Sequence, residues 1–182
     1  MLETLGVELR RDDSQREEED RIQPLRRPRA EPEPSSPIAG LPTSVAFQLA
    51  NCCRPVRGDP IIGLVRTGKP VGIHHADCPT LRKIDPAVEH TVDVSWERST
   101  KPLRSATRLV VMALNQPGAL GAVSTVIGKQ GGNITDVRFG HRAPDLYEIF
   151  LDVEVDGLEQ LRRVQAALRA SSMVSSVERV LA

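Results

Sequence analysis

Hydrophobic and polar positions form their clearest patterns in the last part of the chain. Apolar side chains fill or alternate along four segments there, which predicts strands. Between them, leucine, valine and isoleucine recur at helical spacing in two segments, which predicts amphipathic helices. The predicted strands are 109–114, 134–139, 147–155 and 174–181, and the predicted helices are 120–127 and 158–168. This βαββαβ order is that of a ferredoxin-like unit, with four antiparallel strands on one face of two helices.

The residues before this unit have the short strands and turn residues of a small β-rich module. Thr67-Gly68-Lys69-Pro70 is typical of a turn, and the apolar runs on either side of it predict a hairpin. The alternation that ends at Trp96 predicts an edge strand. The predicted elements are strands at 61–65, 71–74 and 91–96 and a short helix at 79–83, capped by Asp77.

The first forty residues are predicted to form a disordered tail. Charged residues crowd the stretch before residue 20, and five prolines fall between residues 24 and 37. Such a segment buries too little apolar surface to offset the entropy that ordering costs. The sequence therefore predicts a tail over 1–40, a cysteine-containing module over 41–104 and a ferredoxin-like domain over 105–182, an α+β chain.

Charge and cysteine content narrow the class of protein. The chain has 24 basic and 24 acidic side chains, so it is not a uniformly basic nucleic-acid binder, although residues 51–104 hold nine basic against six acidic ones. Three cysteines, two of them adjacent, make a poor disulfide framework and favour a reducing, cytoplasmic setting. The sequence contains no apolar run of the length that a membrane span needs.

Two sets of motifs resemble known modules. The first is similar to an ACT domain, through Asn115-Gln116-Pro117-Gly118-Ala119-Leu120 and Gly131-Gly132-Asn133-Ile134. The second resembles the conserved-cysteine module of long RelA/SpoT proteins, through Leu49-Ala50-Asn51-Cys52-Cys53-Arg54-Pro55, Gly58-Asp59-Pro60-Ile61-Ile62-Gly63 and Ile73-His74-His75-Ala76-Asp77-Cys78. The resemblance covers residues 40–182. It implies the regulatory C-terminal part of a bifunctional (p)ppGpp synthetase/hydrolase of the stringent response.

The resemblance also implies what this part does and what it contacts. In that family the N-terminal half makes and hydrolyses the alarmones (p)ppGpp, and the C-terminal half senses starvation. The implied partners are the upstream catalytic half, ribosomal RNA and uncharged tRNA. Nothing in the chain resembles the metal cluster of the hydrolase or the nucleotide site of the synthetase, so no catalytic residue is expected.

The cysteines and one histidine of the first module are expected to form a Cys₃His zinc site, because Zn²⁺ favours thiolates and imidazole in a closed tetrahedron. The ligands would be Cys52, Cys53, His74 and Cys78. Adjacent cysteines point to opposite sides of a strand, so this site requires a sharp turn near Arg54-Pro55. The alternative is that the thiols are reduced and pack as small apolar side chains beside His74. His75 is expected to face solvent.

Basic side chains near this module are the expected phosphate contacts of the RNA partner that the resemblance implies. They are Arg54, Arg57, Arg66, Lys69, Arg82 and Lys83. No aromatic residues are interleaved with them, so the sequence does not predict base stacking. The alternative is an ordinary solvated surface.

The loop at 115–119 leads into a predicted helix, whose first turn leaves N–H groups that suit a carboxylate. By resemblance to amino-acid-sensing ACT domains, Asn115, Gln116, Pro117, Gly118, Ala119 and Leu120 hold the carboxylate side of an amino acid, and Asn133 and Ile134 meet its amine and side chain, often across a dimer interface. Walls formed by Leu120, Val123, Ile134 and Val137 favour valine or isoleucine.

The sequence leaves three functions open. The first is an amino-acid sensor that restrains or releases the catalytic half. The second is a ribosome- and tRNA-docking module with no small ligand. The third is a dimerisation platform, because ACT domains pair with one another. An activity of its own, for example at His141 and Asp145, is the least expected.

Overall fold

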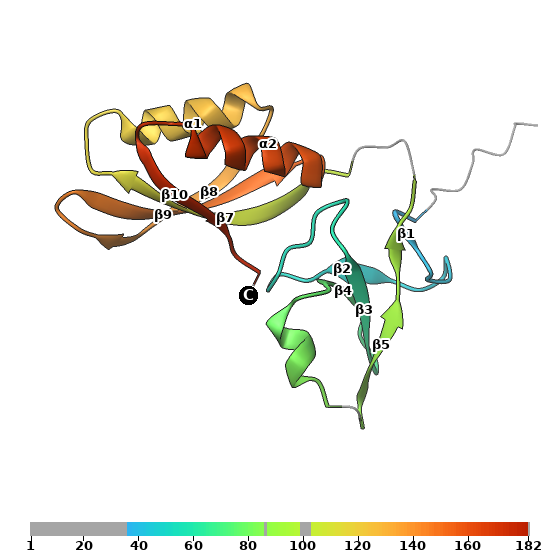
Figure 1. Cartoon of the computed structure of the whole chain (residues 1–182). Coiled ribbons are helices and arrows are strands. Elements are labelled where there is room, and N and C mark those ends of the chain that lie inside the picture. The colour runs from blue at the N-terminus through green and yellow to red at the C-terminus, as the bar shows by residue number, and fades with distance from the viewer. Residues whose placement is uncertain (1–35, 86, 99–102, 182) are drawn as a thin grey trace, which may run out of the picture. The chain divides into compact units, whose positions relative to one another are not determined.

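The computed structural model describes residues 36–85, 87–98 and 103–181, and Figure 1 shows how their strands and helices are arranged. Residues 1–35, most of the predicted tail, lie outside this described part. The α+β class predicted from the sequence is confirmed. Among the described residues, no helix has the length and apolar character that crossing a membrane requires.

The predicted hairpin is the centre of the first sheet. Strand β3 (Ile61–Arg66) pairs antiparallel with β4 (Val71–His75), and Gly68 turns the chain between them with a φ of 71°. The strand β2 (Phe47–Leu49) lies parallel to β4, and β5 (Glu89–Asp93) pairs with β3. The sheet order is therefore β2-β4-β3-β5, which confirms that β5 is an edge strand.

The strand predicted over 91–96 is in fact divided between two sheets. The edge strand β5 ends at Asp93, and β6 (Ser95–Trp96) pairs with β1 (Ile38–Ala39) in a second small sheet. Gly40, which follows β1 with a φ of 93°, approaches the backbone so closely that an added Cβ would lie 2.8 Å from the Asp93 carbonyl oxygen. The described end of the predicted tail therefore belongs to this module, where Ile38 is 2% exposed.

The core of this module lies on one face of the hairpin sheet. Ile61, Val71 and Ile73 are buried there with Ile38 from β1. The partly buried residues around them are Leu41, Val45, Phe47, Leu49, Val65, Val92, Val94 and Trp96. Because side chains alternate along a strand, the other face carries Leu64, Gly72 and His74. The predicted helix after β4 is the 3₁₀ helix η2 (Pro79–Lys83), which Cys78 precedes without a side-chain cap.

The second domain has the predicted βαββαβ order, which is confirmed. Its elements are β7 (Ser105–Leu114), α1 (Ala119–Lys129), β8 (Asn133–Arg142), β9 (Leu146–Val155), α2 (Leu158–Arg169) and β10 (Val174–Arg179). The four strands are antiparallel in the order β10-β7-β9-β8. Both helices lie side by side on one face of this sheet (Figure 1). The strand β8 therefore forms an open edge.

The apolar stripes of the two helices close the core of this domain. Val123 and Ile127 of α1 and Leu161, Val164 and Leu168 of α2 are fully buried. They pack on Leu109, Val111, Ala113, Ile149, Leu151, Val153, Val155 and Val177 of the sheet. Burying each such side chain contributes about 1.5–3 kcal/mol, so these stripes hold the helices on the sheet.

Candidate metal centre and ligand loop

The three cysteines and His74 meet in one cluster. Their ligand atoms all lie within 4.8 Å of one another. The Cys52 Sγ atom is 3.5 Å from His74 Nδ1 and 3.6 Å from Cys78 Sγ, and Cys53 Sγ is 3.8 Å from His74 Nδ1. A tetrahedral zinc site has edges of about 3.8 Å between sulfurs and about 3.6 Å between sulfur and nitrogen. The cluster therefore has the donors of a closed zinc site, and these three distances are close to the edges of one.

The turn that two adjacent cysteine ligands require is present. Residues 51–53 form a turn in which the Arg54 N–H donates to the Ala50 carbonyl at 2.9 Å. Arg54 itself has a φ of 44°, a left-handed conformation that is uncommon for a residue with a side chain. The chain reverses here, which lets both sulfurs reach the ring of His74.

Local hydrogen bonds hold the other members of the cluster. The His75 N–H donates to Cys53 Sγ at 3.2 Å, and the Cys78 N–H donates to the His75 carbonyl at 2.9 Å. The expectation that His75 faces solvent is wrong, because it is 7% exposed. The Nδ1 atom of His75 accepts a hydrogen bond from the Asp77 N–H at 3.1 Å, so this nitrogen is engaged away from the Cys/His cluster.

Burial and neighbouring charges set the protonation of the cluster. Burial raises the pKa of the Cys53 thiol to about 12, so without a cation this group keeps its proton. Burial raises the pKa of Cys78, but hydrogen bonds from Thr80 and the two neighbouring thiols outweigh it, and the net shift is downward. Burial and the Arg66 charge lower the pKa of His74, which favours the neutral imidazole that a metal binds. A divalent cation would displace the Cys53 proton.

The same contacts also fit the packed-thiol alternative. Cys53 and Cys78 are buried with Ala50, and Cys52 and Leu81 pack against them. Metal content therefore separates the two interpretations.

The loop before α1 has the predicted form but is exposed rather than enclosed. Gly118 occupies the N-cap position with a φ of 85°, where no side chain caps the helix. Asn115 donates through its Nδ2 to the Pro144 carbonyl at 3.1 Å, which fixes the loop to the turn before β9. Gln116 and Pro117 are exposed, Leu120 is 37% exposed, and Ala119 is fully buried.

Asn133 lies at the opposite end of the sheet from this loop. In the strand register, Asn133 of β8 is level with Glu154 of β9, and Glu154 is level with Ala106 near the start of β7. The loop, by contrast, follows Leu114 at the end of β7. Eight residues of strand separate those two levels, or about 27 Å. The Asn133 Nδ2 instead donates to Glu154 Oε2 at 3.1 Å. One copy of the chain therefore does not bring the two halves of the predicted amino-acid site together.

The predicted apolar walls are also divided. Val123 is fully buried in the core, so it is not available as a wall, and Ile134 is partly buried against the same core. By contrast, Val137 and Phe139 of the edge strand β8 are 39% and 43% exposed. The exposed apolar surface therefore follows the open edge of the sheet.

The six basic residues do not form a single patch. Arg54 pairs with Asp152, Arg57 donates to the Glu97 carbonyl, and Arg66 pairs with Glu89. Lys69, Arg82 and Lys83 are exposed, the first at the β3–β4 turn and the other two in the last turn of η2.

The sequence did not indicate that the segment 54–59 packs into the second domain. Val56 is fully buried in the core of that domain. The Asp59 carboxylate accepts two hydrogen bonds from Arg179 of β10, and Arg179 also donates to the Arg54 carbonyl at 3.2 Å. The Leu158 N–H at the start of α2 donates to the Arg57 carbonyl at 2.7 Å. The polypeptide that leaves the cysteine turn is thus a structural part of the ferredoxin-like domain.

Asp152 joins the same segment to the sheet. Its carboxylate accepts hydrogen bonds from Arg108 Nε at 2.6 Å and Nη2 at 2.8 Å, and it pairs with Arg54. The hydrogen bonds from Arg108, opposed by burial and reinforced by Arg54, hold the pKa of Asp152 at about 2. The alternation of apolar and polar residues along β9 identified Asp152 only as a polar residue. Its arginine partners could not be predicted, because they are distant in sequence.

The depressed pKa of Asp152 predicts a pH-dependent contribution to stability. A carboxyl whose folded pKa lies below its unfolded value stabilises the fold above the unfolded value, and this is lost as pH falls through the folded value. Asp152→Asn is therefore expected to lower the free energy of unfolding by about 2 kcal/mol at neutral pH. The difference should shrink between about pH 4 and pH 2. Urea titrations across this range measure it.

The exposed Asp145 offers a matched control for this measurement. Asp145→Asn should change the free energy of unfolding by no more than about 0.5 kcal/mol at any of these pH values. A difference between wild type and Asp152→Asn that stays constant down to pH 2 would contradict the proposed role of the ionised carboxylate.

Comparison with known proteins gives a consistent result for both modules. Residues 36–97 match the RelA/SpoT RIS domain, and residues 104–179 match the ACT domain. Over 126 residues, 69% of this chain, the sequence is 33% identical to the GTP pyrophosphokinase rsh of Brucella abortus strain 2308 and covers 17% of it. Over 143 residues, 79% of this chain, it is 29% identical to the bifunctional (p)ppGpp synthase/hydrolase SpoT of Escherichia coli K12 and covers 20% of it.

The chain thus spans about a fifth of the length of these relatives. Among solved structures, the ACT domain from the GTP pyrophosphokinase of Chlorobium tepidum is similar with a TM-score of 0.38 and 19% identity. That similarity covers 42% of this chain and 99% of the solved domain.

Proposed function

Because the chain carries the RIS and ACT domains of the RelA/SpoT family and belongs to that family's regulatory C-terminal region, we propose that it senses amino-acid status for a (p)ppGpp-synthesising and -hydrolysing catalytic half. The ligand is a small apolar amino acid, valine or isoleucine. Its binding changes the activity of the catalytic half by favouring one of two states of the whole protein. The proposed setting is the cytoplasm, which holds the amino-acid pool.

The observation that carries the proposal is the exposed N-terminus of α1. Gly118 leaves the approach to the first turn clear, and an added Cβ there would meet nothing within 4 Å. The N–H groups of a first helical turn and the helix dipole favour a carboxylate. The exposed side chain of Leu120 beside them suits an apolar ligand side chain.

The separation of Asn133 from this loop supports a homodimer as the sensing form. A second copy that pairs antiparallel along the open edge of β8 would reverse its strand direction, so its Asn133 would lie near the loop of the first copy. Such pairing would also cover Val137 and Phe139, the exposed apolar residues of that edge. Each dimer then holds two sites, and each site takes residues from both copies.

Calorimetric titration of the twenty amino acids tests this proposal. Valine or isoleucine should give saturable heat, and Asn133→Ala should lower the affinity about tenfold, since it removes one polar contact. The exposed Asn51 in the other module is a matched control, and Asn51→Ala should bind as wild type does.

A mixing experiment tests the shared site directly. Gly118→Asp places a carboxylate at the helix N-terminus and should abolish binding by repelling the ligand carboxylate. An equal mixture of Gly118→Asp and Asn133→Ala chains should recover about a quarter of the wild-type sites, because half of randomly formed dimers are mixed and each holds one intact site. No recovery in a mixture shown to exchange subunits would contradict a site between copies.

A docking module with no small ligand is the alternative, and the exposed Lys69, Arg82 and Lys83 favour it. These residues would contact phosphates of ribosomal RNA or uncharged tRNA in a salt-dependent way. If none of the twenty amino acids gave binding heat with the folded, dimeric protein, docking would replace sensing as the proposed function.

The Cys/His cluster of the RIS domain is proposed to hold one structural Zn²⁺. The support is the donor set and the close approach of the ligand atoms of Cys52, Cys53, His74 and Cys78. The metal would supply folding energy to a small module and fix the turn that leads into the segment 54–59.

A further inference from the structure

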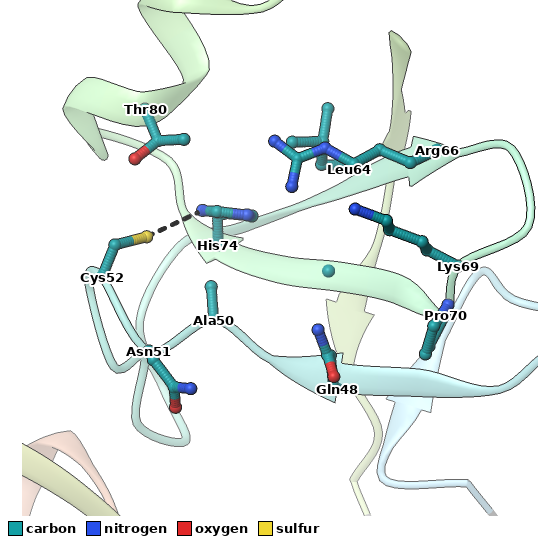
Figure 2. A pocket seen from close by; sticks show the side chains of 11 residues that line it. Gln48, Ala50, Asn51, Cys52, Leu64, Arg66, Lys69, Pro70, His74 and Thr80 are labelled. Atoms are coloured by element: carbon teal, nitrogen blue, oxygen red, sulfur yellow. Dashed lines mark hydrogen bonds between the residues drawn. The ribbon is translucent and has the colours of Figure 1, made fainter.

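A hollow of about 290 Å³ opens on the polar face of the RIS sheet. It lies over β4, between β2 and β3, on the side opposite the apolar core of the module. Gln48, Arg66, Lys69, Gly72, His74 and Thr80 line it, and Figure 2 shows their arrangement. Cys52 and His74 belong to both the hollow and the metal cluster, so the hollow borders the proposed zinc site.

Gly72 creates this hollow. In the register of the sheet it lies between Gln48 of β2 and Leu64 of β3, at the centre of the polar face. A side chain at this position would occupy the space, and an added Cβ would already lie 3.2 Å from His74 Nε2. An alanine here therefore fills part of the hollow and presses on the histidine ring.

Two basic side chains project over the hollow. Arg66 and Lys69 extend from the end of the β3–β4 hairpin over β4 toward His74 (Figure 2). The described residues that line the hollow include no carboxylate. Glu89 pairs with Arg66 Nε, which leaves the two Nη groups of that guanidinium available. The Lys69 ammonium has no protein partner among the described residues.

His74 adds a directed donor. Its Nδ1 faces the cysteine sulfurs at 3.5 and 3.8 Å, so the ring turns its Nε2 toward Gly72 and the hollow. When Nδ1 binds a metal, the proton of the neutral ring lies on Nε2, and such an N–H is normally bound by a carboxylate, a carbonyl or water. Among the described residues, none accepts a hydrogen bond from this nitrogen. The assignment of an Nε2–H donor to His74 rests on the proposed zinc site.

We propose that this hollow binds the dianionic phosphate group of a small phosphorylated molecule. The ammonium of Lys69, the guanidinium of Arg66 and the Nε2–H of His74 supply charge-assisted donors, and Gln48 and Thr80 supply an amide and a hydroxyl. The volume admits a phosphate with a small organic group attached, at the lower limit of ligand pockets. A terminal phosphate offers three unbridged oxygens to these donors, whereas a phosphate within an RNA chain offers two.

Nuclear magnetic resonance of the zinc-loaded chain tests the proposal. The His74 Nε2–H resonance is followed during titration with inorganic phosphate, with a nucleoside 5′-monophosphate and with a short RNA that lacks terminal phosphates. Phosphate and the nucleotide should shift this resonance saturably. Lys69→Gln should weaken their binding about tenfold or more, since it removes a charge-assisted hydrogen bond. Gly72→Ala should abolish it, and Lys129→Gln, at an exposed lysine of α1, should leave it unchanged.

Three results would overturn the proposal: no shift with phosphate or nucleotide, binding of the RNA alone, or an equal loss in Lys129→Gln. The zinc content of the same sample keeps the two proposals apart. If a zinc-loaded chain does not bind phosphate, the phosphate site is refuted and the metal site is not. Phosphate binding that depends on Lys69 and Gly72 in a chain without zinc refutes the metal site and upholds the anion site. Neither outcome bears on amino-acid binding at the ACT domain.

Discussion

Replacing Asp59 with alanine is expected to lower the free energy of unfolding by about 3–5 kcal/mol, because it leaves a buried guanidinium without its carboxylate. The side chain of Asp59 is 1% exposed and that of its partner Arg179 is 11% exposed. Arg179 donates from Nη1 to Oδ1 at 2.9 Å and from Nη2 to Oδ2 at 2.6 Å. Asp59 Oδ2 also accepts the Val56 N–H at 2.7 Å, so the substitution removes the acceptor of a second buried donor.

Urea and thermal unfolding of four chains measure this effect: wild type, Asp59→Ala, Arg179→Ala and the double variant. The melting temperature of Asp59→Ala should fall by about 10 °C. The double variant should lose less than the sum of the single losses, because it leaves neither charge unpaired. The exposed Asp93→Ala on β5 serves as the control and should stay within about 0.5 kcal/mol of wild type. A loss below about 1 kcal/mol in Asp59→Ala would contradict the pairing.

Local periodicity was sufficient to predict the helices and strands of the second domain and the β3–β4 hairpin of the first. The stripes of α1 and α2 and the alternation along β9 are buried as their spacing indicates. The turn at Gly68 and the stop of α1 before Gly131 follow from conformations that glycine adopts readily, with φ values of 71° and 75°. These features depend on a few neighbouring residues, which a sequence displays directly.

Contacts between distant segments account for what periodicity missed. The β1 strand is two residues long and follows a proline-rich stretch, so no pattern predicted it, and only pairing with β6 forms it. The ion pairs of Asp59 and Asp152 join residues 120 and 44 positions apart. Charged residues carry no periodic signal for such partners. The burial of Val56 in the second domain is hidden for the same reason.

The geometry of the amino-acid site was partly readable from the predicted topology. The strands β7 and β8 run parallel to each other, because both pair antiparallel with β9, and the helix α1 between them returns the chain across the sheet. The end of β7 and the start of β8 therefore lie at opposite ends, which separates Asn115 from Asn133. The sequence contained this signal, and it argues for a second copy of the chain. The Cys/His cluster, by contrast, could be predicted from ligand chemistry, because cysteine and histidine are few enough in this chain to be matched.

Removal of zinc is expected to have the largest effect on the RIS domain. The purified chain should contain one zinc per molecule, and a strong chelator should lower the melting temperature by at least about 10 °C. The physical reason is that zinc binds such sites with a free energy on the order of 10 kcal/mol, which is available to the folded state alone. Elemental analysis and thermal unfolding, with and without chelator, measure both quantities.

Two substitutions test whether zinc stabilises the fold by binding at the Cys/His cluster. Cys78→Ser nearly preserves shape but removes a thiolate, and His74→Ala removes the imidazole. Both should lose zinc and should melt where the chelated wild type melts, and the chelator should have little further effect on them. The exposed histidine His90 gives the control, because His90→Ala should keep its zinc and its melting temperature.

The packed-thiol alternative makes the opposite prediction. If Cys53 and Cys78 act only as small apolar side chains around Ala50, the wild type carries no zinc and the chelator changes nothing. Cys78→Ser would then cost only the burial of a hydroxyl, about 1–3 kcal/mol, and would do so equally with and without chelator. The Cys53 thiol, whose burial raises its pKa to about 12, would stay protonated. If the chelator lowers the melting temperature of the wild type but not that of Cys78→Ser, metal binding holds the turn that leads into the ACT core. If the chelator changes neither, apolar packing holds it.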